Sequence, residues 1–121
     1  MPGPRSLASC AALAAAAACA PTDGPSLATI APAAARPGAR VTVTGARLCG
    51  GTAAADGTCA RLPSGGIDFS LTPPMYRAAV VSWSDQRVVV TVPATVAIGP
   101  TSVYATVDGR TSNALDFEVL P

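Results

Sequence analysis

Two alternating runs of residues in Ser102–Val119, SVYATVDGRTSNALDFEV, decide the fold of this chain. From Ser102 to Val107, and again from Leu115 to Val119, small or apolar residues alternate with polar residues or tyrosine. A period of two places the apolar residues on one face of a β-strand and the others on the opposite face. The Asp108-Gly109 pair after the first run predicts a hairpin turn, because glycine accepts positive φ without steric cost.

The rest of the chain from residue 28 onward shows the same period of two and no helical period. Further inward-facing residues are predicted in three more runs: Val41 and Val43, Ile67 and Phe69, and Val88, Val90 and Val92. Turn signals separate the runs: Pro37-Gly38, Gly50-Gly51, Gly65-Gly66, Pro73-Pro74, Ser84-Asp85 and Gly99-Pro100. This spacing predicts an all-β chain, an antiparallel β-sandwich of about seven strands.

The composition of the 121 residues excludes several classes of protein. The chain has no histidine and no lysine, which rules out Ser-His or Cys-His catalysis, histidine metal ligands and Schiff-base chemistry. Its eight arginines are dispersed along the sequence and nearly balanced by seven acidic residues, whereas nucleic-acid binding needs clustered cations. We therefore expect one small domain without a nucleic-acid partner.

The N-terminus has the organisation of an export signal. Arg5 precedes an apolar run from Leu7 to Ala18, which is too short to span about 30 Å of hydrocarbon. Small residues then lead into Cys19, and this stretch resembles the lipobox of bacterial lipoproteins, whose cysteine takes a diacylglycerol. We expect residues 1–18 to be a lipoprotein-type signal peptide, Cys19 to be the site of lipid attachment and residues 19–26 to be a flexible tether.

Two other interpretations of the N-terminus stay open. Ala18-Cys19-Ala20 also fits the small-x-small site of ordinary signal peptidase and soluble secretion, although Pro21 is a poor residue after the cut. Alternatively, the alanine-rich tract is low-complexity sequence or follows a misplaced start codon, and the chain carries no working signal.

Cys49 and Cys59 bracket the segment CGGTAAADGTC, which is rich in Gly, Thr and Ala and can bend freely. If residues 1–18 are removed and Cys19 carries a lipid, these two cysteines remain as a pair. A zinc site needs about four ligands, which two cysteines without histidine do not supply. We expect a disulfide between them, as in other exported proteins. Two unpaired thiols in a cytosolic protein are the alternative.

A series of short motifs runs through residues 27–120: Ile30-x-Pro32, Pro37–Gly45, Ile67–Phe69, Val81–Asp85, Val88–Pro93, Gly99-Pro100, Thr111–Asn113 and Phe117–Val119. In order and spacing they resemble the IPT/TIG domain, the immunoglobulin-like module of plexins, some transcription factors and many bacterial surface proteins. The resemblance implies an immunoglobulin-like sandwich. Leu48–Gly66 departs from the family pattern as an insertion between the second and third strands, and the family implies no role for it.

The acidic residues give little support to a catalytic or metal site. Asp68 and Asp116, at outward strand positions, are the carboxylates of a small-hydrolase alternative, but no two acidic residues adjoin in sequence as a catalytic pair would suggest. Asp56 and Asp108 lie beside turn signals and could supply oxygen to calcium, which needs about six to eight ligands. We therefore expect no enzyme activity, no cofactor and no metal.

Trp83 and Tyr104 are the aromatic candidates for surface binding, although Trp83 also fits packing at the edge of the sandwich. We expect a non-catalytic lipoprotein of the bacterial cell envelope, periplasmic or surface-exposed, which acts as an interaction or structural module through its loops. Its membrane contact would be the lipid anchor alone, and its partner an unidentified protein or glycan. A carbohydrate-binding surface module is the alternative, because IPT/TIG-like domains often accompany glycan-active enzymes.

Overall fold

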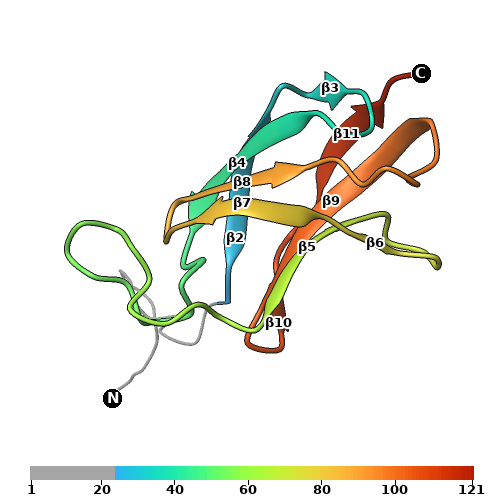
Figure 1. Cartoon of the computed structure of the whole chain (residues 1–121). Helices are drawn as coiled ribbons and strands as arrows, with labels where there is room; N and C mark the ends of the chain where they lie inside the picture. The colour runs from blue at the N-terminus through green and yellow to red at the C-terminus, as the bar shows by residue number, and fades with distance from the viewer. Residues whose placement is uncertain (1–23) are drawn as a thin grey trace, which may run out of the picture.

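The chain folds into two β-sheets packed face to face in the computed structural model, which describes residues 24–121 (Figure 1). One sheet has the order β3 (Ala34–Ala35), β11 (Leu115–Val119), β9 (Gly99–Val107), β5 (Gly65–Phe69) and β6 (Tyr76–Arg77), with β10 (Arg110–Thr111) paired to β9. The other sheet has the order β2 (Ser26–Ala31), β4 (Arg40–Ala46), β8 (Arg87–Thr91) and β7 (Ala79–Trp83). The described residues contain no helix, and the one parallel pairing among their strands joins β3 to β11. The predicted all-β, immunoglobulin-like sandwich is confirmed.

The core lies between the two sheets and consists mainly of the residues that the period of two predicts to face inward. Most of these side chains are β-branched, a shape that packs well on a pleated surface. Phe69 of β5 and Phe117 of β11 add an edge-to-face contact with ring centroids 5.4 Å apart. The fully buried side chains include Val41, Val43, Ile67, Val88, Val90, Val103 and Val119.

The Asp108-Gly109 turn forms the predicted hairpin between β9 and β10. Asp108 has a φ of 50° and Gly109 a φ of 86°, and Arg110 pairs with Val107 across the turn. Positive φ at both central residues is typical of the type I′ turn, whose twist matches that of the strands it joins.

The predicted turns at Gly65-Gly66 and Gly99-Pro100 are wrong, because these residues begin β5 and β9. Gly65 has a φ of 115°, and a Cβ there would lie 2.1 Å from the carbonyl oxygen of Thr106. Glycine is therefore present because the backbones of β5 and β9 approach closely. In the sequence, a glycine needed for close contact between distant strands looks the same as a glycine needed for a turn.

The folded part begins before the predicted boundary at residue 27, since Pro25 is buried and Ser26 belongs to β2. Arg47 holds this segment in place by donating a hydrogen bond from Nε to the carbonyl oxygen of Gly24, at 2.8 Å. The predicted signal peptide at 1–18, the lipid site at Cys19 and most of the predicted tether lie outside the described residues. Among residues 24–121, no helix is long and apolar enough to cross a membrane.

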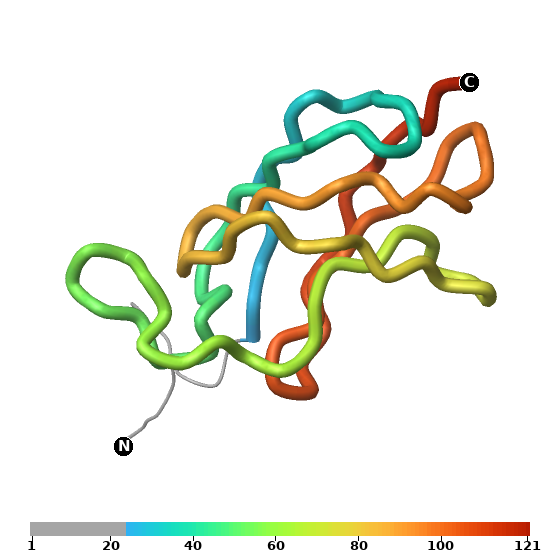
Figure 2. The backbone as a smooth tube through the Cα atoms, viewed as in Figure 1, coloured from blue at the N-terminus to red at the C-terminus, as the bar shows by residue number. Residues whose placement is uncertain are grey.

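Loops gather at the two ends of β9, and these ends define two poles of the domain (Figure 2). The entry pole, near Val107, contains the start of the described chain at Gly24 and the connection 47–64. The distal pole, near Gly99, contains the connections 70–75 and 92–98.

Replacing Phe69 by alanine should lower the free energy of unfolding by about 3–5 kcal/mol, because it removes a fully buried ring and leaves a cavity. Leu71→Ala is the matched control: Leu71 lies two residues further along and is 56% exposed, so its loss should change stability by less than about 0.5 kcal/mol. Chemical denaturation measures both, and equal effects would contradict the core as described.

Candidate functional site

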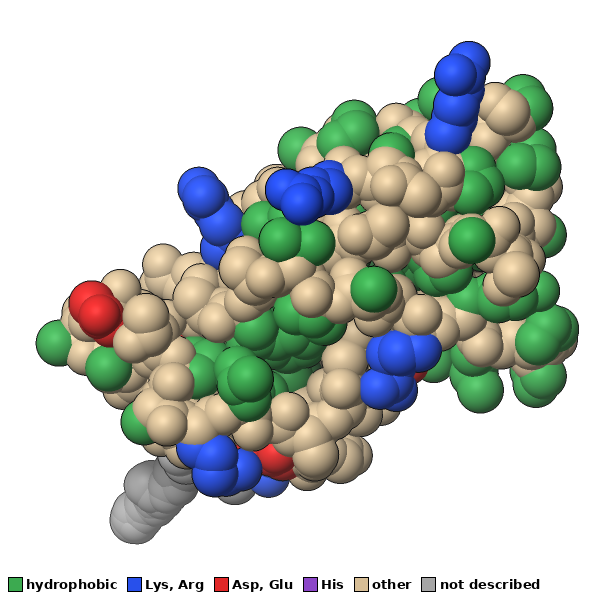
Figure 3. Space-filling view, viewed as in Figure 1, with side chains coloured by type: hydrophobic (Ala, Val, Ile, Leu, Met, Phe, Trp, Pro, Cys, Tyr) green, Lys and Arg blue, Asp and Glu red, His purple; other side chains and the backbone are tan. Residues whose placement is uncertain are grey.

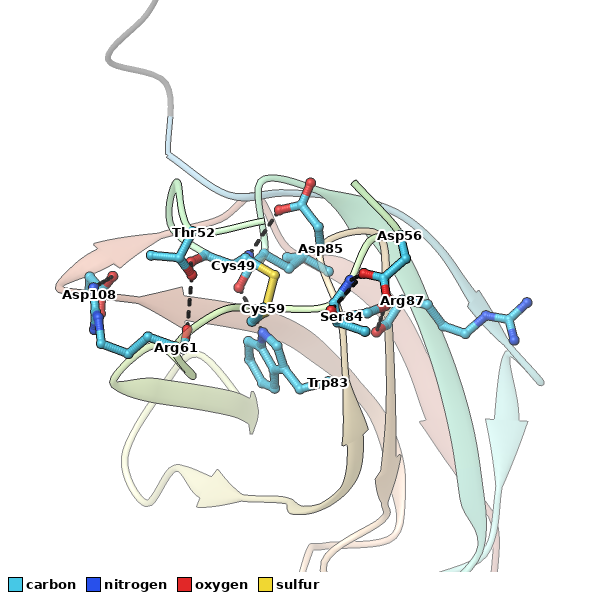
Figure 4. Close-up of a disulfide and its surroundings, with 12 residues drawn as sticks. Cys49, Thr52, Asp56, Cys59, Arg61, Trp83, Ser84, Asp85, Arg87 and Asp108 are labelled. Carbon is cyan, nitrogen blue, oxygen red and sulfur yellow. Dashed lines mark hydrogen bonds and ion pairs between the residues drawn. A yellow bond between two sulfur atoms is a disulfide. The ribbon is translucent and has the colours of Figure 1, made fainter. Parts of the chain in front are cut away.

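The predicted disulfide between Cys49 and Cys59 is present at the entry pole, with the two Cα atoms 5.2 Å apart (Figure 4). Thr52 reinforces the loop from inside, because its Oγ1 donates to the carbonyl oxygens of Cys49, at 2.9 Å, and of Arg61, at 3.0 Å. Ala53 also forms a bridge with Cys59. The loop is therefore a small paired structure and not a freely bending segment.

Asp85, in the turn between β7 and β8, holds both limbs of this loop. Its backbone N–H donates to the carbonyl oxygen of Gly57 at 2.9 Å, and its own carbonyl oxygen accepts from the N–H of Leu48 at 3.0 Å. Its carboxylate Oδ1 accepts from the N–H of Cys49 at 3.1 Å. A residue that the sequence marks only as a turn signal thus fixes the insertion to the sandwich.

Trp83 lies beneath the loop at the end of β7, where it is half-buried against the core. Its indole Nε1 donates to the carbonyl oxygen of Leu48 at 2.7 Å (Figure 4). The indole N–H is therefore already used within the fold, as expected for packing at the sandwich edge. Ligand binding by Trp83 stays a prediction.

Tyr104 lies half-exposed on the outer face of β9, on the side opposite the core. Its hydroxyl donates to Met75 Sδ at 3.4 Å, and its cross-strand neighbour in β5 is Asp68. Partial burial and the nearby Asp68 carboxylate raise the pKa of Tyr104 above its ordinary value. Tyr104 therefore stays neutral, with one edge fixed beside Met75.

Asp68 is not exposed to solvent, contrary to what its outward strand position predicts. It is only 7% exposed, because Arg77 of β6 covers it with Nε 2.6 Å and Nη2 3.2 Å from its two carboxylate oxygens. These hydrogen bonds raise the pKa of Arg77 above its ordinary value. Gly66 leaves room for the arginine, since a Cβ there would lie 2.8 Å from Arg77 Cδ. The sequence pattern misses this pair because it depends on the register between β5 and β6.

Three large apolar side chains are exposed together on the distal pole: Leu71 is 56% exposed, Met75 52% and Ile98 55%. They belong to the connections 70–75 and 92–98, neither of which contains a charged residue. Figure 3 shows apolar side chains gathered at this end of the molecule. A cavity of about 190 Å³ lies here, with walls that include Pro73, Pro74, Tyr76, Val96, Ile98 and Pro100. We refer to this surface as the apolar patch.

The entry pole instead gathers arginines that are dispersed in the sequence. Arg47 and Arg110 line a cavity of about 360 Å³ together with Asp108. Arg61 lies beside it, with Nη2 4.0 Å from Asp108 Oδ2 (Figure 4). Sequence spacing could not find this cluster, because Arg47 and Arg61 lie at opposite ends of the connection 47–64 and Arg110 lies in β10.

The candidate calcium ligands make hydrogen bonds to the protein. Asp56 Oδ1 accepts from the N–H of Thr58 at 3.0 Å and from its hydroxyl at 2.7 Å, and these bonds lower the pKa of Asp56. Asp108 Oδ1 accepts from the N–H of Ser64 at 2.9 Å. Over residues 24–121, no group of three or more Cys, Asp or Glu side chains is placed to hold a metal ion.

Comparison with known proteins supports the fold. No family model matches the chain, and a search of curated proteins finds no match. Among solved structures, a gamma-CGTase from alkalophilic Bacillus clarkii is similar over 80% of this chain, with 28% identity and a TM-score of 0.62. A proposed phosphatase from Bacteroides thetaiotaomicron aligns over 84% of this chain at 8% identity, with a TM-score of 0.49.

The chain spans 12% of the length of the CGTase and 19% of the phosphatase. This chain is therefore similar in fold to a small part of a larger enzyme. It is an immunoglobulin-like β-sandwich, a fold compatible with a non-catalytic module.

Loss of the disulfide should lower the free energy of unfolding by about 2.8 kcal/mol, the chain-entropy value for a loop of about 11 residues. Urea denaturation with and without a thiol reductant measures the difference. A variant that carries both Cys49→Ser and Cys59→Ser is the control, since reductant should not destabilise it further. If the oxidised and reduced proteins unfold at the same urea concentration, Asp85 and Trp83 alone hold the loop.

Proposed function

We propose that this protein is a non-catalytic lipoprotein of the bacterial cell envelope whose IPT/TIG-like domain presents the apolar patch to a protein partner. The exposure of Leu71, Met75 and Ile98 in two uncharged connections of one pole is the observation that carries the proposal. Large apolar side chains that are exposed together, and not singly, are typical of interaction surfaces.

The shape of the patch also favours a protein partner. Prolines and Tyr76 form its walls, so little conformational entropy is lost when another surface packs against them. The pole has no charge in its two connections, and a partner with an apolar contact surface therefore fits it best.

A non-catalytic role is supported by the state of the acidic residues. Asp68 is paired with Arg77, and Asp56, Asp85 and Asp108 accept hydrogen bonds from backbone N–H groups. These carboxylates already serve as hydrogen-bond acceptors within the fold, which leaves them less free to contact a substrate as catalytic groups.

The proposed location in the cell envelope rests on the signal-like N-terminus and on the disulfide. Disulfides persist in oxidising compartments outside the bacterial cytoplasm, and the Cys49–Cys59 disulfide is part of this fold. Cys19 is the proposed attachment site of the lipid.

The experiment has two steps and uses the full chain in its native host. Intact mass of the protein from the membrane fraction comes first, and we expect a species that begins at Cys19 and carries a lipid. A full-length species without lipid would remove the envelope lipoprotein from the proposal.

The second step places a photo-cross-linking amino acid at position 98 of the apolar patch. We expect one defined protein adduct, which Leu71→Asp abolishes without loss of folding. Position 81 is the matched control, because Val81 is an apolar side chain of similar exposure, 45%, on β7. Equal adducts from both positions, or none from position 98, would contradict the role of the patch.

A carbohydrate-binding surface is the second candidate, and Tyr104 favours it. This half-exposed ring lies between Ser102 and Thr106 on the outer face of β9, with the Arg77 guanidinium nearby. Aromatic rings flanked by hydroxyl groups and fixed polar donors suit neutral sugars.

If this face binds glycan, Tyr104→Ala should abolish retardation of the protein in affinity gels that contain soluble glucans. Trp83→Phe is the control, because it keeps an aromatic ring beneath the disulfide loop and lies away from β9. Unchanged, negligible retardation of the wild type and both variants would exclude the sugar candidate.

A further inference from the structure

We propose that the entry pole is the face that the anchored domain turns towards an anionic phospholipid bilayer, with its arginine-lined cavity accepting a phosphate headgroup. This inference rests on the lipid anchor at Cys19 proposed above. It departs from the sequence-based expectation that the lipid anchor is the only membrane contact, and it gives the arginines of this pole a role that the apolar patch does not explain.

The cavity is built around the point where the chain enters the fold. Gly24 and Pro25 form one wall, and Arg47 and Arg110 line it from the ends of other strands. Arg47 is held in place, because its Nε donates to Gly24 and its Nη2 lies 3.5 Å from Ser26 Oγ. A guanidinium fixed in this way is suited to phosphate, which it binds through a planar fork of donors.

The charge of the cluster complements a phosphate headgroup. Arg47, Arg61 and Arg110 carry three positive charges against one negative charge on Asp108, a balance of +2. Asp108 is engaged by the Ser64 N–H and by Arg61, while Arg61 itself is 65% exposed. Arginine N–H groups therefore remain accessible to an anion that approaches from solvent.

Among residues 24–121, the other nearby acidic residues do not cancel this charge. Asp85 directs its Oδ1 to the N–H of Cys49, within the loop. Asp56 lies on the opposite side of the disulfide from Arg61 and Asp108 (Figure 4), close to Arg87. On the face that Figure 3 shows, basic and acidic side chains lie next to one another at the lower end of the molecule.

The position of Cys19 in the sequence ties this pole to the membrane. Five residue steps separate Cys19 from Gly24, which is no more than about 18 Å of fully extended chain. A lipid on Cys19 therefore keeps the cavity close to the headgroups, where each arginine within a Debye length of about 8 Å is attracted to anionic lipid. The apolar patch lies at the other end of β9 and would face away from the bilayer.

The test uses the lipidated full chain, first verified by intact mass, in vesicles of phosphatidylcholine with or without phosphatidylglycerol. Amide hydrogen exchange is measured for the segments 47–64 and 107–111 of the entry pole and for 70–76 and 92–98 of the distal pole. We expect exchange to slow at the entry pole only, and only with phosphatidylglycerol. The protection should be lost in about 1 M salt, where the Debye length falls to about 3 Å.

A variant with Arg61→Gln and Arg110→Gln should lose this protection and keep its fold, since both side chains are exposed. Arg36→Gln with Arg40→Gln is the matched control, because it removes the same charge from exposed sites, one in the β3–β4 connection and one at the start of β4, and should keep the protection.

Several outcomes overturn the inference. Equal protection of both poles, protection that survives high salt, or equal loss in the control variant would each show that the arginines of the entry pole do not orient the domain. Equal slowing by inorganic phosphate without vesicles would assign the cavity to free anions. Absence of lipid at Cys19 in the intact mass removes the anchor, and the proposed envelope function falls together with this inference. If the lipid is present but the expected protection is not observed, only this inference is overturned, and the proposed envelope function is unaffected.

Discussion

The pairing of β5 with β9 is the contact on which the rest of the domain depends. It joins residues 34 to 42 positions apart, from Phe69 with Val103 to Gly65 with Val107, and it brings the main apolar side chains of both strands to one face. The close approach at Gly65 leaves no space for a side chain. Both poles follow from this register, because each end of the ladder determines which connections lie side by side.

The insertion is integrated into this framework by a few polar contacts. Leu48 and Cys49 are fully buried, so the loop begins inside the core and not on its surface. Asp85 and the Trp83 indole satisfy the backbone groups that this burial would otherwise leave without partners. The disulfide restricts the conformational freedom of the loop in the unfolded chain, whereas the hydrogen bonds fix the position of the loop on the folded sandwich.

Much of the sandwich could be predicted from sequence, because its inward-facing valines recur at every second position and the Asp-Gly pair at 108–109 is a strong hairpin signal. The turn predicted at Gly65 is wrong for a physical reason: this glycine is needed for a contact between strands that no local sequence pattern encodes. The same limit applies to the candidate sites. Tyr104 is found on the outward face that its strand position predicts, but the Asp68–Arg77 pair and the arginine cluster depend on register and on loops meeting in space. The apolar patch left a weak signal, three large apolar residues in connections that also contain proline.

The entry of the chain at Gly24 has a mechanical consequence. Force applied to the domain through its N-terminal end would act along β2, which is antiparallel to β4 over five registered residue pairs. Hydrogen bonds across such a ladder lie at right angles to the pull and share the load, whereas a hairpin pulled open at its turn breaks them one at a time. Asn113 links β2 further to the rest of the domain, since its side chain both donates a hydrogen bond to and accepts one from the backbone of Leu27. The sandwich is therefore built to bear tension in shear.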